Sequence, residues 1–165
     1  HFLDYGQFEG RRAHPQYGNA YFLGHATAAL TTTVPTVQSA PYSHYKLSDT
    51  PLVSVIIPNM NGYVHLEALF DSLDIQTYRN FEVIFVDDAS TDDSAGYASK
   101  RGAHVVSLAQ QVGFAQANNE GLRESKGELI ALLNNDMRVD ANWLESMVLT
   151  MKANPQAGAV APLIR

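Results

Sequence analysis

The chain contains no cysteine among its 165 residues, which excludes a disulfide framework, a thiolate metal site and a cysteine nucleophile. It also lacks any apolar run of the roughly 20 residues that a helix needs to cross a bilayer. Basic residues are few, with 11 Lys and Arg against 17 Asp and Glu, for a formal net charge of −6. This balance argues against a general nucleic-acid binder. A nucleotide ligand stays open, because one bound cation can neutralise a diphosphate locally.

Several common site motifs are also absent. There is no Gly-x-Gly-x-x-Gly and no Gly-x-x-x-x-Gly-Lys-Ser/Thr loop, so dinucleotide-binding and P-loop interpretations lose their main support. There is no Gly-x-Ser-x-Gly elbow for a serine hydrolase, and the six histidines show no close pairing typical of a metal site. The N-terminus has neither an initiator Met nor a signal-peptide pattern, so we expect an internal segment of a longer protein.

The character of the sequence changes near residue 50. Residues 1–48 are rich in Tyr, His, Gly, Pro and Thr, and we expect an irregular segment that ends in an extended linker. In residues 49–165, strand-like and helix-like stretches alternate, which predicts an α/β fold with a mostly parallel sheet and helices on both faces. An apolar fraction of 45% is enough for a real core.

Periodicity and turn signals give these stretches their bounds. Strands are predicted at 52–57, 81–86, 104–108, 128–133 and 159–164, and helices at 64–74, 94–101, 114–125 and 141–153. Ser90, Thr91 and Asp92 are candidate N-caps of the second helix, and Asp140 is the predicted N-cap of the last. Right-handed crossovers place the carboxyl ends of all these strands along one edge of the sheet.

Three of the predicted strands end in polar residues: Pro58, Asn59 and Asn61 after the first, Asp87 and Asp88 after the second, and Asn134, Asn135 and Asp136 after the fourth. Ligands of open α/β sheets bind just beyond the carboxyl ends of the strands, so these groups suggest one site. Carboxylate and amide oxygens there suit Mg²⁺ or Mn²⁺ and, through the metal, a diphosphate.

Each group also has a structural interpretation. The two asparagines of the first group can simply form a turn and an N-cap. Two adjacent carboxylates at a buried strand end repel each other and must find donors, a cation or water, and capping the next helix is one solution. Asp136 is the metal candidate, because Asp140 can cap the following helix in its place. Gly121, inside a predicted helix, indicates close packing against the sheet.

Taken in order, four stretches resemble the family-2 glycosyltransferases of GT-A fold, especially the bacterial branch that builds surface polysaccharides. These stretches are 53–62, 81–92, 113–121 and 127–136, and the resemblance covers about 51–165. It implies a hexosyl- or rhamnosyltransferase that uses a UDP-, dTDP- or GDP-linked sugar donor with Mg²⁺ or Mn²⁺. Transfer to a saccharide or lipid-linked acceptor with inversion is implied as well.

The resemblance also implies roles for single residues. Pro58, Asn59 and Asn61 would lie by the nucleoside, Asp88 would contact the base with Asp87 nearby, and Gly113 and Asn119 would lie along the nucleotide and ribose. Asn134, Asn135 and Asp136 occupy the place of the family's DxD motif, with Asp136 as its last carboxylate. Asn134 stands where the first acid is usual, so one charge fewer should weaken metal affinity.

The family's catalytic base belongs to a later segment, which we expect after Arg165. We therefore expect the donor-binding half of a GT-A domain, incomplete at its C-terminal side and inactive alone. The resemblance implies a cytoplasmic protein, peripheral at the inner face of the plasma membrane through segments outside these residues. Residues 1–11 are similar to the end of a short helical module found beside such transferases.

Two alternatives remain open from the sequence. The first is a non-catalytic nucleotide-sugar-binding or regulatory module. The second is a receiver-like signalling domain, which also places acidic pairs after a strand. A receiver would need a Lys after a later strand, and no Lys follows Lys152.

Overall fold

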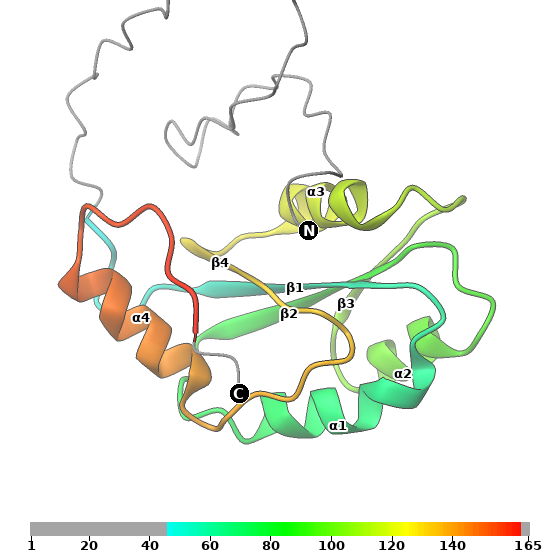
Figure 1. Cartoon of the computed structure of the whole chain (residues 1–165), viewed down its shortest axis with the longest axis horizontal. Helices are drawn as coiled ribbons and strands as arrows, with labels where there is room; N and C mark the ends of the chain where they lie inside the picture. Colours follow the sequence, from blue (N-terminus) through cyan, green and yellow to red (C-terminus); the bar gives the residue numbers. More distant parts are fainter. Residues whose placement is uncertain (1–45, 163–165) are drawn as a thin grey trace, which may run out of the picture. The chain divides into compact units, whose positions relative to one another are not determined.

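The structure, a computed structural model, describes residues 46–162 (Figure 1). The predicted irregular segment falls outside the described residues up to position 45, as does the stretch that resembles a helical module. The described part is built on one four-stranded parallel sheet of β1 (Val53–Asn59), β2 (Phe81–Asp87), β3 (His104–Ser107) and β4 (Leu129–Leu132). These strands alternate with four helices, α1 (Tyr63–Asp74), α2 (Ser94–Lys100), α3 (Phe114–Glu124) and α4 (Trp143–Ala153). The predicted α/β alternation is confirmed.

The strands lie in the order β3-β2-β1-β4. This order places the chain among doubly wound sheets of the 3-2-1-4 type, whereas a receiver domain has the order 2-1-3-4-5. The receiver-like alternative is therefore wrong. Among the described residues, no helix is both long and apolar enough to cross a bilayer.

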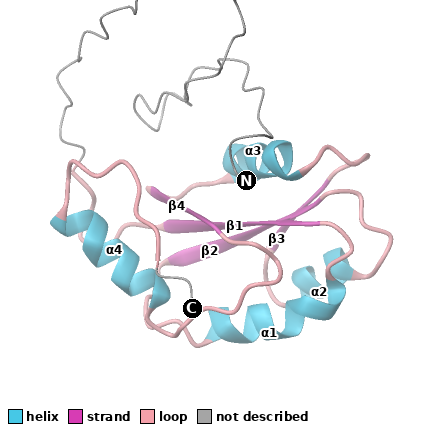
Figure 2. Cartoon of the chain, viewed as in Figure 1, coloured by secondary structure: helices cyan, strands magenta, loops and turns pink. Residues whose placement is uncertain are grey.

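Helices cover both faces of the sheet (Figures 1 and 2). On one face, α1 and α4 bury apolar side chains against β1 and β2, around Leu69, Phe85 and Leu144. On the other face, α3 is the one helix of residues 46–162 that packs over Ile56, Ile84 and Val86. Successive side chains of β1 and β2 point to opposite faces of the sheet and pack in two different cores. Both strands are therefore continuous apolar runs in the sequence.

Helix α3 lies so close to the sheet that its interior position 121 must be a glycine. A Cβ atom added at Gly121 would come within 2.5 Å of Ile56 Cγ2 and 3.0 Å of Val86 Cγ2. The backbone of α3 thus lies directly on the sheet, and the predicted packing role of Gly121 is confirmed.

Element bounds agree with the predictions to within two residues, with three corrections. The first helix is preceded by Gly62 as its N-cap rather than by an asparagine. The last begins at Trp143 with Asn142 as its N-cap, so the predicted cap Asp140 is wrong; its carbonyl oxygen instead accepts from Trp143 N. The strand predicted at 159–164 is absent from residues 159–162, and the remainder lies outside the described residues.

Candidate functional site

The carboxyl ends of the strands meet along one edge of the sheet because every strand is parallel. In the registers of the sheet, Asn59 at the end of β1 lies opposite Asp87 at the end of β2, which in turn lies opposite Ser107 of β3. β4 pairs with β1 up to Leu132, opposite Ile56, so its following loop also reaches this edge. The predicted convergence of the polar strand ends is confirmed.

The β1–α1 and β2–α2 loops are hydrogen-bonded to each other at this edge. Ser90 Oγ accepts from Asn59 Nδ2 at 3.2 Å and from the backbone N–H of Asn61 at 2.9 Å. In return, Asn61 Oδ1 accepts from the backbone N–H of Thr91 at 2.7 Å. Asn61 takes a left-handed backbone conformation with φ 51°, which asparagine tolerates better than most residues. Asn61 therefore shapes this turn, in line with the structural interpretation.

The β4–α4 loop joins the same network through Asn135. Its Nδ2 donates to Asn59 Oδ1 at 2.7 Å. This hydrogen bond lies over Gly62, where an added Cβ would come within 2.2 Å of Asn135 Nδ2 and 2.3 Å of Asn59 Oδ1. Asn59 is only 2% exposed and uses both ends of its amide, so it connects three loops.

The two adjacent carboxylates have different surroundings. Asp88 is buried, and its two oxygens accept from the backbone N–H groups of Val112 at 2.7 Å and Gly113 at 2.8 Å. It therefore holds the loop before α3 and does not cap α2. Asp87 is buried as well, and its Oδ1 has no hydrogen-bond partner among the described residues. Burying such an oxygen without a donor costs free energy, which a ligand N–H or a cation would recover.

Gly113 and Asn119 complete the predicted nucleotide side. Gly113 is the N-cap of α3 with φ 86°, a conformation that favours glycine, and it presents its N–H to Asp88. Asn119 lies exposed on α3, and its side chain makes no hydrogen bond within the described part of the chain. The network of strand ends therefore includes Gly113 but not the Asn119 side chain. Asn118, one residue earlier, is buried instead and its Oδ1 is unpartnered there.

The predicted metal residues lie in the turn after β4. Asn134 and Asp136 are exposed, and their side chains make no hydrogen bond within residues 46–162. Among those residues, no group of three or more His, Asp or Glu side chains is arranged to hold a metal ion. Mg²⁺ often binds through one or two carboxylates together with phosphate oxygens and water. A single free carboxylate beside an amide oxygen fits that mode, provided that a phosphate completes the shell.

Ser90 and Asp92 also contribute to this edge, although the sequence predicts them only as candidate caps of α2. None of the predicted caps Ser90, Thr91 and Asp92 is the N-cap of that helix. Asp93 occupies the N-cap position without a side-chain bond, whereas Asp92 Oδ1 accepts from Ser94 N at 3.1 Å and Asp92 Oδ2 accepts from Tyr63 N at 3.1 Å. Burial opposes the charge on Asp92, but hydrogen bonds from Ser94 Oγ and these amides outweigh it and lower its pKa. The bond to Tyr63 crosses between loops, so spacing along the sequence gave no signal for it.

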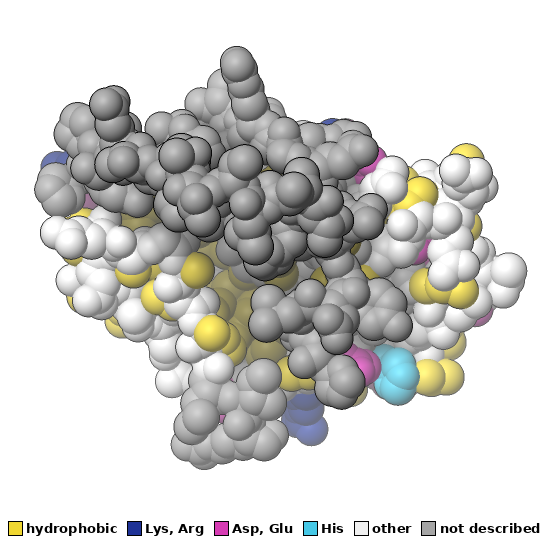
Figure 3. Space-filling model, turned by 45° about the horizontal axis from the view of Figure 1, so that its top comes forward, with side chains coloured by type: hydrophobic (Ala, Val, Ile, Leu, Met, Phe, Trp, Pro, Cys, Tyr) yellow, Lys and Arg dark blue, Asp and Glu magenta, His cyan; other side chains and the backbone are white. Residues whose placement is uncertain are grey.

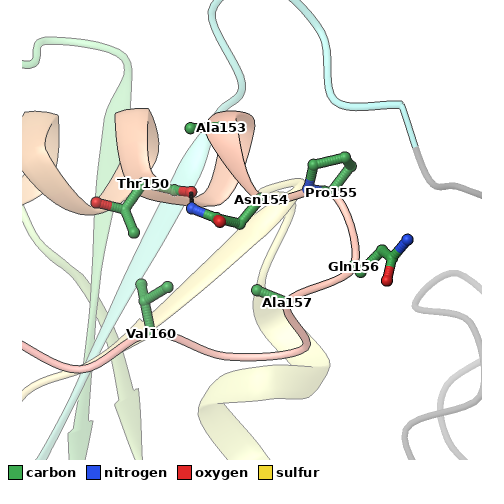
Figure 4. Close-up of a pocket in the computed structure, with 7 residues that line it drawn as sticks. All are labelled: Thr150, Ala153, Asn154, Pro155, Gln156, Ala157 and Val160. Atoms are coloured by element: carbon green, nitrogen blue, oxygen red, sulfur yellow. Dashed lines mark hydrogen bonds between the residues drawn. The ribbon is translucent and has the colours of Figure 1, made fainter.

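One hollow of the described surface lies elsewhere. Figure 4 shows it between the last turn of α4 and the following loop, lined by Thr150, Ala153, Asn154, Pro155, Gln156, Ala157 and Val160. Lys152 in the same turn donates to the carbonyl oxygen of Asp49, just before β1, so this hollow belongs to the opposite edge of the sheet. It contains no titratable side chain and is not the candidate site.

Charge on the described surface follows the composition. In the space-filling view of Figure 3, Lys and Arg side chains emerge at only a few points among the described residues, with hydrophobic and neutral side chains between them. At the carboxyl edge, backbone N–H groups, amide side chains and a bound cation can hold an anionic ligand.

Comparisons with known proteins agree with this architecture. The model of the family described as "Glycosyl transferase family 2" matches residues 54–165. The chain is 35% identical over 101 residues to glycosyltransferase GlyG of Streptococcus pneumoniae serotype 4, covering 58% of this chain and 34% of that protein. It is 34% identical over 122 residues to O-antigen biosynthesis protein RfbC of Myxococcus xanthus, covering 70% of this chain and 10% of that protein.

A solved structure extends the likeness to three dimensions. The mannosyltransferase PcManGT from Pyrobaculum calidifontis, in complex with GDP-Man and Mn²⁺, superposes with a TM-score of 0.65 at 26% identity. The match covers 77% of this chain and 40% of that one, so the chain spans no more than about two fifths of any of these three proteins. The predicted resemblance and the GT-A fold are confirmed, and the chain belongs to glycosyl transferase family 2.

Proposed function

We propose that this chain binds the nucleotide-diphospho-sugar donor of an inverting glycosyl transfer to a saccharide or lipid-linked acceptor. The observation that carries the proposal is the polar network at the carboxyl edge of the sheet. It joins four loops through buried side chains and leaves one buried carboxylate oxygen, Asp87 Oδ1, without a donor among the residues that the structure describes. Family membership and a related mannosyltransferase bound to GDP-Man and Mn²⁺ support a nucleotide-sugar as the ligand.

The nucleoside side is assigned to the β1, β2 and α3 loops. Pro58, Asn59 and Asn61 form the wall by the nucleoside, and Gly113 and Asn119 lie along the ribose. Asp88 contacts the base. Each carboxylate oxygen has two lone pairs, so Asp88 can accept a base N–H while it still holds Val112 and Gly113. Asp87 lies nearby with its unpaired oxygen.

The diphosphate side is assigned to the turn after β4. Asp136 would hold Mg²⁺ or Mn²⁺, with Asn134 supplying an amide oxygen and Asn135 keeping the turn attached to β1. When bound, the cation supplies charge neutralisation of the departing nucleoside diphosphate. Asp136 is the only carboxylate of this motif, because Asn134 stands where a second acid is usual. The metal should therefore bind more tightly when the diphosphate of the nucleotide supplies further oxygen ligands.

Transfer with inversion needs a carboxylate that removes the proton of the acceptor hydroxyl as it attacks the anomeric carbon. We assign no residue of this chain to that role. The role of these residues is to bind the donor and hold its diphosphate at the sheet edge, where hexosyl and rhamnosyl donors present the same diphosphate chemistry.

Calorimetry of the chain with UDP-, dTDP- and GDP-linked sugars, with and without Mn²⁺, tests the proposal. We expect binding of at least one donor, strengthened by Mn²⁺, and a loss of that strengthening in Asp136→Ala. Asp140→Ala is the matched control, since Asp140 is exposed and its side chain makes no hydrogen bond in the described structure. Equal metal dependence in the wild type and Asp136→Ala would refute the metal assignment. Absence of any donor binding would refute the function.

A further inference from the structure

We propose that Asp92 is a positioning residue of the donor edge, which holds the β1–α1 and β2–α2 loops in the one arrangement that forms the nucleoside wall. The inference rests on the proposed function and deepens it. Asp92 is exposed, and in the described part of the chain its carboxylate is hydrogen-bonded to Tyr63 and Ser94 and not to Asn59, Asn61 or Asp88. It would therefore act through the loops and not by touching the donor.

The carboxylate of Asp92 joins the first residues of two helices. Its Oδ2 accepts from the backbone N–H of Tyr63, the first residue of α1, at 3.1 Å. Its Oδ1 accepts from the backbone N–H and the hydroxyl of Ser94, the first residue of α2. N–H groups at helix starts have no intrahelical partner, and a negative charge is favourable there. One carboxylate thus satisfies orphan donors of both helices and fixes the distance between their starts.

Each of the two loops that lead into these helices has one residue in a left-handed backbone conformation, and the loops are hydrogen-bonded to each other. Asn61 has φ 51° in the first loop and Ala89 has φ 58° in the second. For alanine this conformation is unfavourable and persists only where surrounding contacts determine it. The hydrogen bonds that join Asn61 with Ser90 and Thr91 are such contacts. Asp92 adds a further bond between the loops, from the backbone N–H of Tyr63.

Helices α1 and α2 are also joined at their C-terminal ends, by ion pairs. Arg101, at the end of α2, contacts Asp71 and Asp74 in the last turns of α1 at 2.9 Å and 2.7 Å. This contact lies away from the carboxyl edge, so it stabilises the helix pair without holding the loops. Arg101→Met is therefore the matched control for Asp92→Asn, because it loosens the same two helices at the end that carries no donor group.

Two measurements on the full 165-residue chain test the inference. The first is hydrogen exchange at the backbone amides of Asn61 and Thr91, whose bonds cross between the loops. The second is the affinity for GDP-mannose and UDP-N-acetylglucosamine with Mn²⁺. We expect Asp92→Asn to speed exchange at both amides and to weaken donor binding about tenfold, the scale of one lost hydrogen bond. Arg101→Met should leave the exchange rates and the donor affinity unchanged, even where it lowers the melting temperature as much as Asp92→Asn does.

Two results would overturn the inference. Unchanged exchange at Asn61 and Thr91 in Asp92→Asn overturns the inference whether or not a donor binds. Equal weakening of donor binding by Asp92→Asn and Arg101→Met also overturns it, because the effect would then be general destabilisation. Asp93→Asn should behave as the wild type, since the contact of Asp93 is an ion pair between exposed side chains. If the wild type binds no donor but Asp92→Asn frees both amides, the positioning of the loops stands and the proposed function fails.

Discussion

Asn59 shows how one side chain organises the donor edge. Its amide donates to Ser90 through Nδ2 and accepts from Asn135 through Oδ1, in a site that is 2% exposed. Aspartate has the same shape but only accepts, and leucine does neither, so either would leave a buried partner unsatisfied. A residue that sequence reasoning assigned to the ligand therefore also has a demanding structural task.

The space over Gly62 gives the first prediction. Gly62→Ala would place a Cβ 2.2 Å from Asn135 Nδ2 and 2.3 Å from Asn59 Oδ1, which are the ends of side chains and can move. The backbone at this position, φ −103° and ψ 16°, accepts alanine. We expect the fold to survive with a modest loss of melting temperature, while donor affinity falls several-fold in calorimetry. A donor affinity equal to that of the wild type would show that the Asn59–Asn135 bond is dispensable for binding.

Asp92 gives a prediction about pH. Its pKa is lowered in the folded state, so its bonds contribute stability above the unfolded-state pKa of about 3.9, and this contribution is lost as the pH falls through the lower folded-state value. In Asp92→Asn the melting temperature should therefore fall less steeply below about pH 4 than in the wild type. Thermal scans from pH 7 to pH 2.5 measure this, with Asp93→Asn expected to keep the wild-type slope. Identical slopes in the wild type and Asp92→Asn would contradict it.

At the scale of elements, α3 stands out because no other helix of the described part of the chain covers its face of the sheet. Its contact depends on small residues, with Ala117 fully buried and Gly121 lying against Ile56 and Val86. The close approach also brings Gly113, at the start of the helix, to Asp88. Packing at the middle of α3 and the geometry of the nucleotide edge are therefore linked.

This closeness predicts opposite effects of the same substitution in two helices. Gly121→Ala must push α3 away from Ile56 Cγ2, and we expect a loss of about 1–3 kcal/mol in the free energy of unfolding. Gly96→Ala in α2 meets only the end of the exposed Asp93 side chain and gains helix propensity, so we expect about 0.5–1 kcal/mol of stabilisation. Denaturant titration of both variants measures the two changes. A stabilising effect of Gly121→Ala would show that α3 can shift at no cost.

For the molecule as a whole, the residues just before β1 are attached to the far edge of the sheet. Ser48 donates to Glu128 through its hydroxyl and its backbone N–H, and both bonds lower the pKa of Glu128. Lys152 donates to the carbonyl oxygen of Asp49 and Asn80 to that of Thr50. These contacts hold the start of β1 at the edge opposite the donor site.

Shortened chains test this attachment and the predicted domain boundary together. A chain that begins at Lys46 should unfold at the wild-type temperature and bind donor with the wild-type affinity, because it keeps all these contacts. A chain that begins at Pro51 loses the bonds of Ser48, Asp49 and Thr50, and we expect a loss of about 1–2 kcal/mol. Differential scanning calorimetry measures both. If the chain from Lys46 were already as unstable as the chain from Pro51, the first 45 residues would be part of the folding unit.

Much of this protein follows from local sequence. Apolar runs ending in polar residues determine strands that end at one edge, and the alternation with helices determines a parallel sheet. The order of its polar motifs was enough to predict the GT-A fold and the family. Gly121 was expected to pack closely because a glycine inside a helix has a cost that some contact must offset.

Only the tertiary structure decided which polar side chains at the sheet edge are hydrogen-bonded to one another. Asn59 joins Asn135 across 76 positions, and Asp92 joins Tyr63 across 29, so no local pattern encodes either pair. The cap of α4 and the coil at 159–162 were mispredicted, because short polar turns satisfy backbone groups in several equivalent ways. The sequence determined which residues reach the edge of the sheet. Only the packed fold decided which of them are bound to one another and which, such as Asp136, remain free for a ligand.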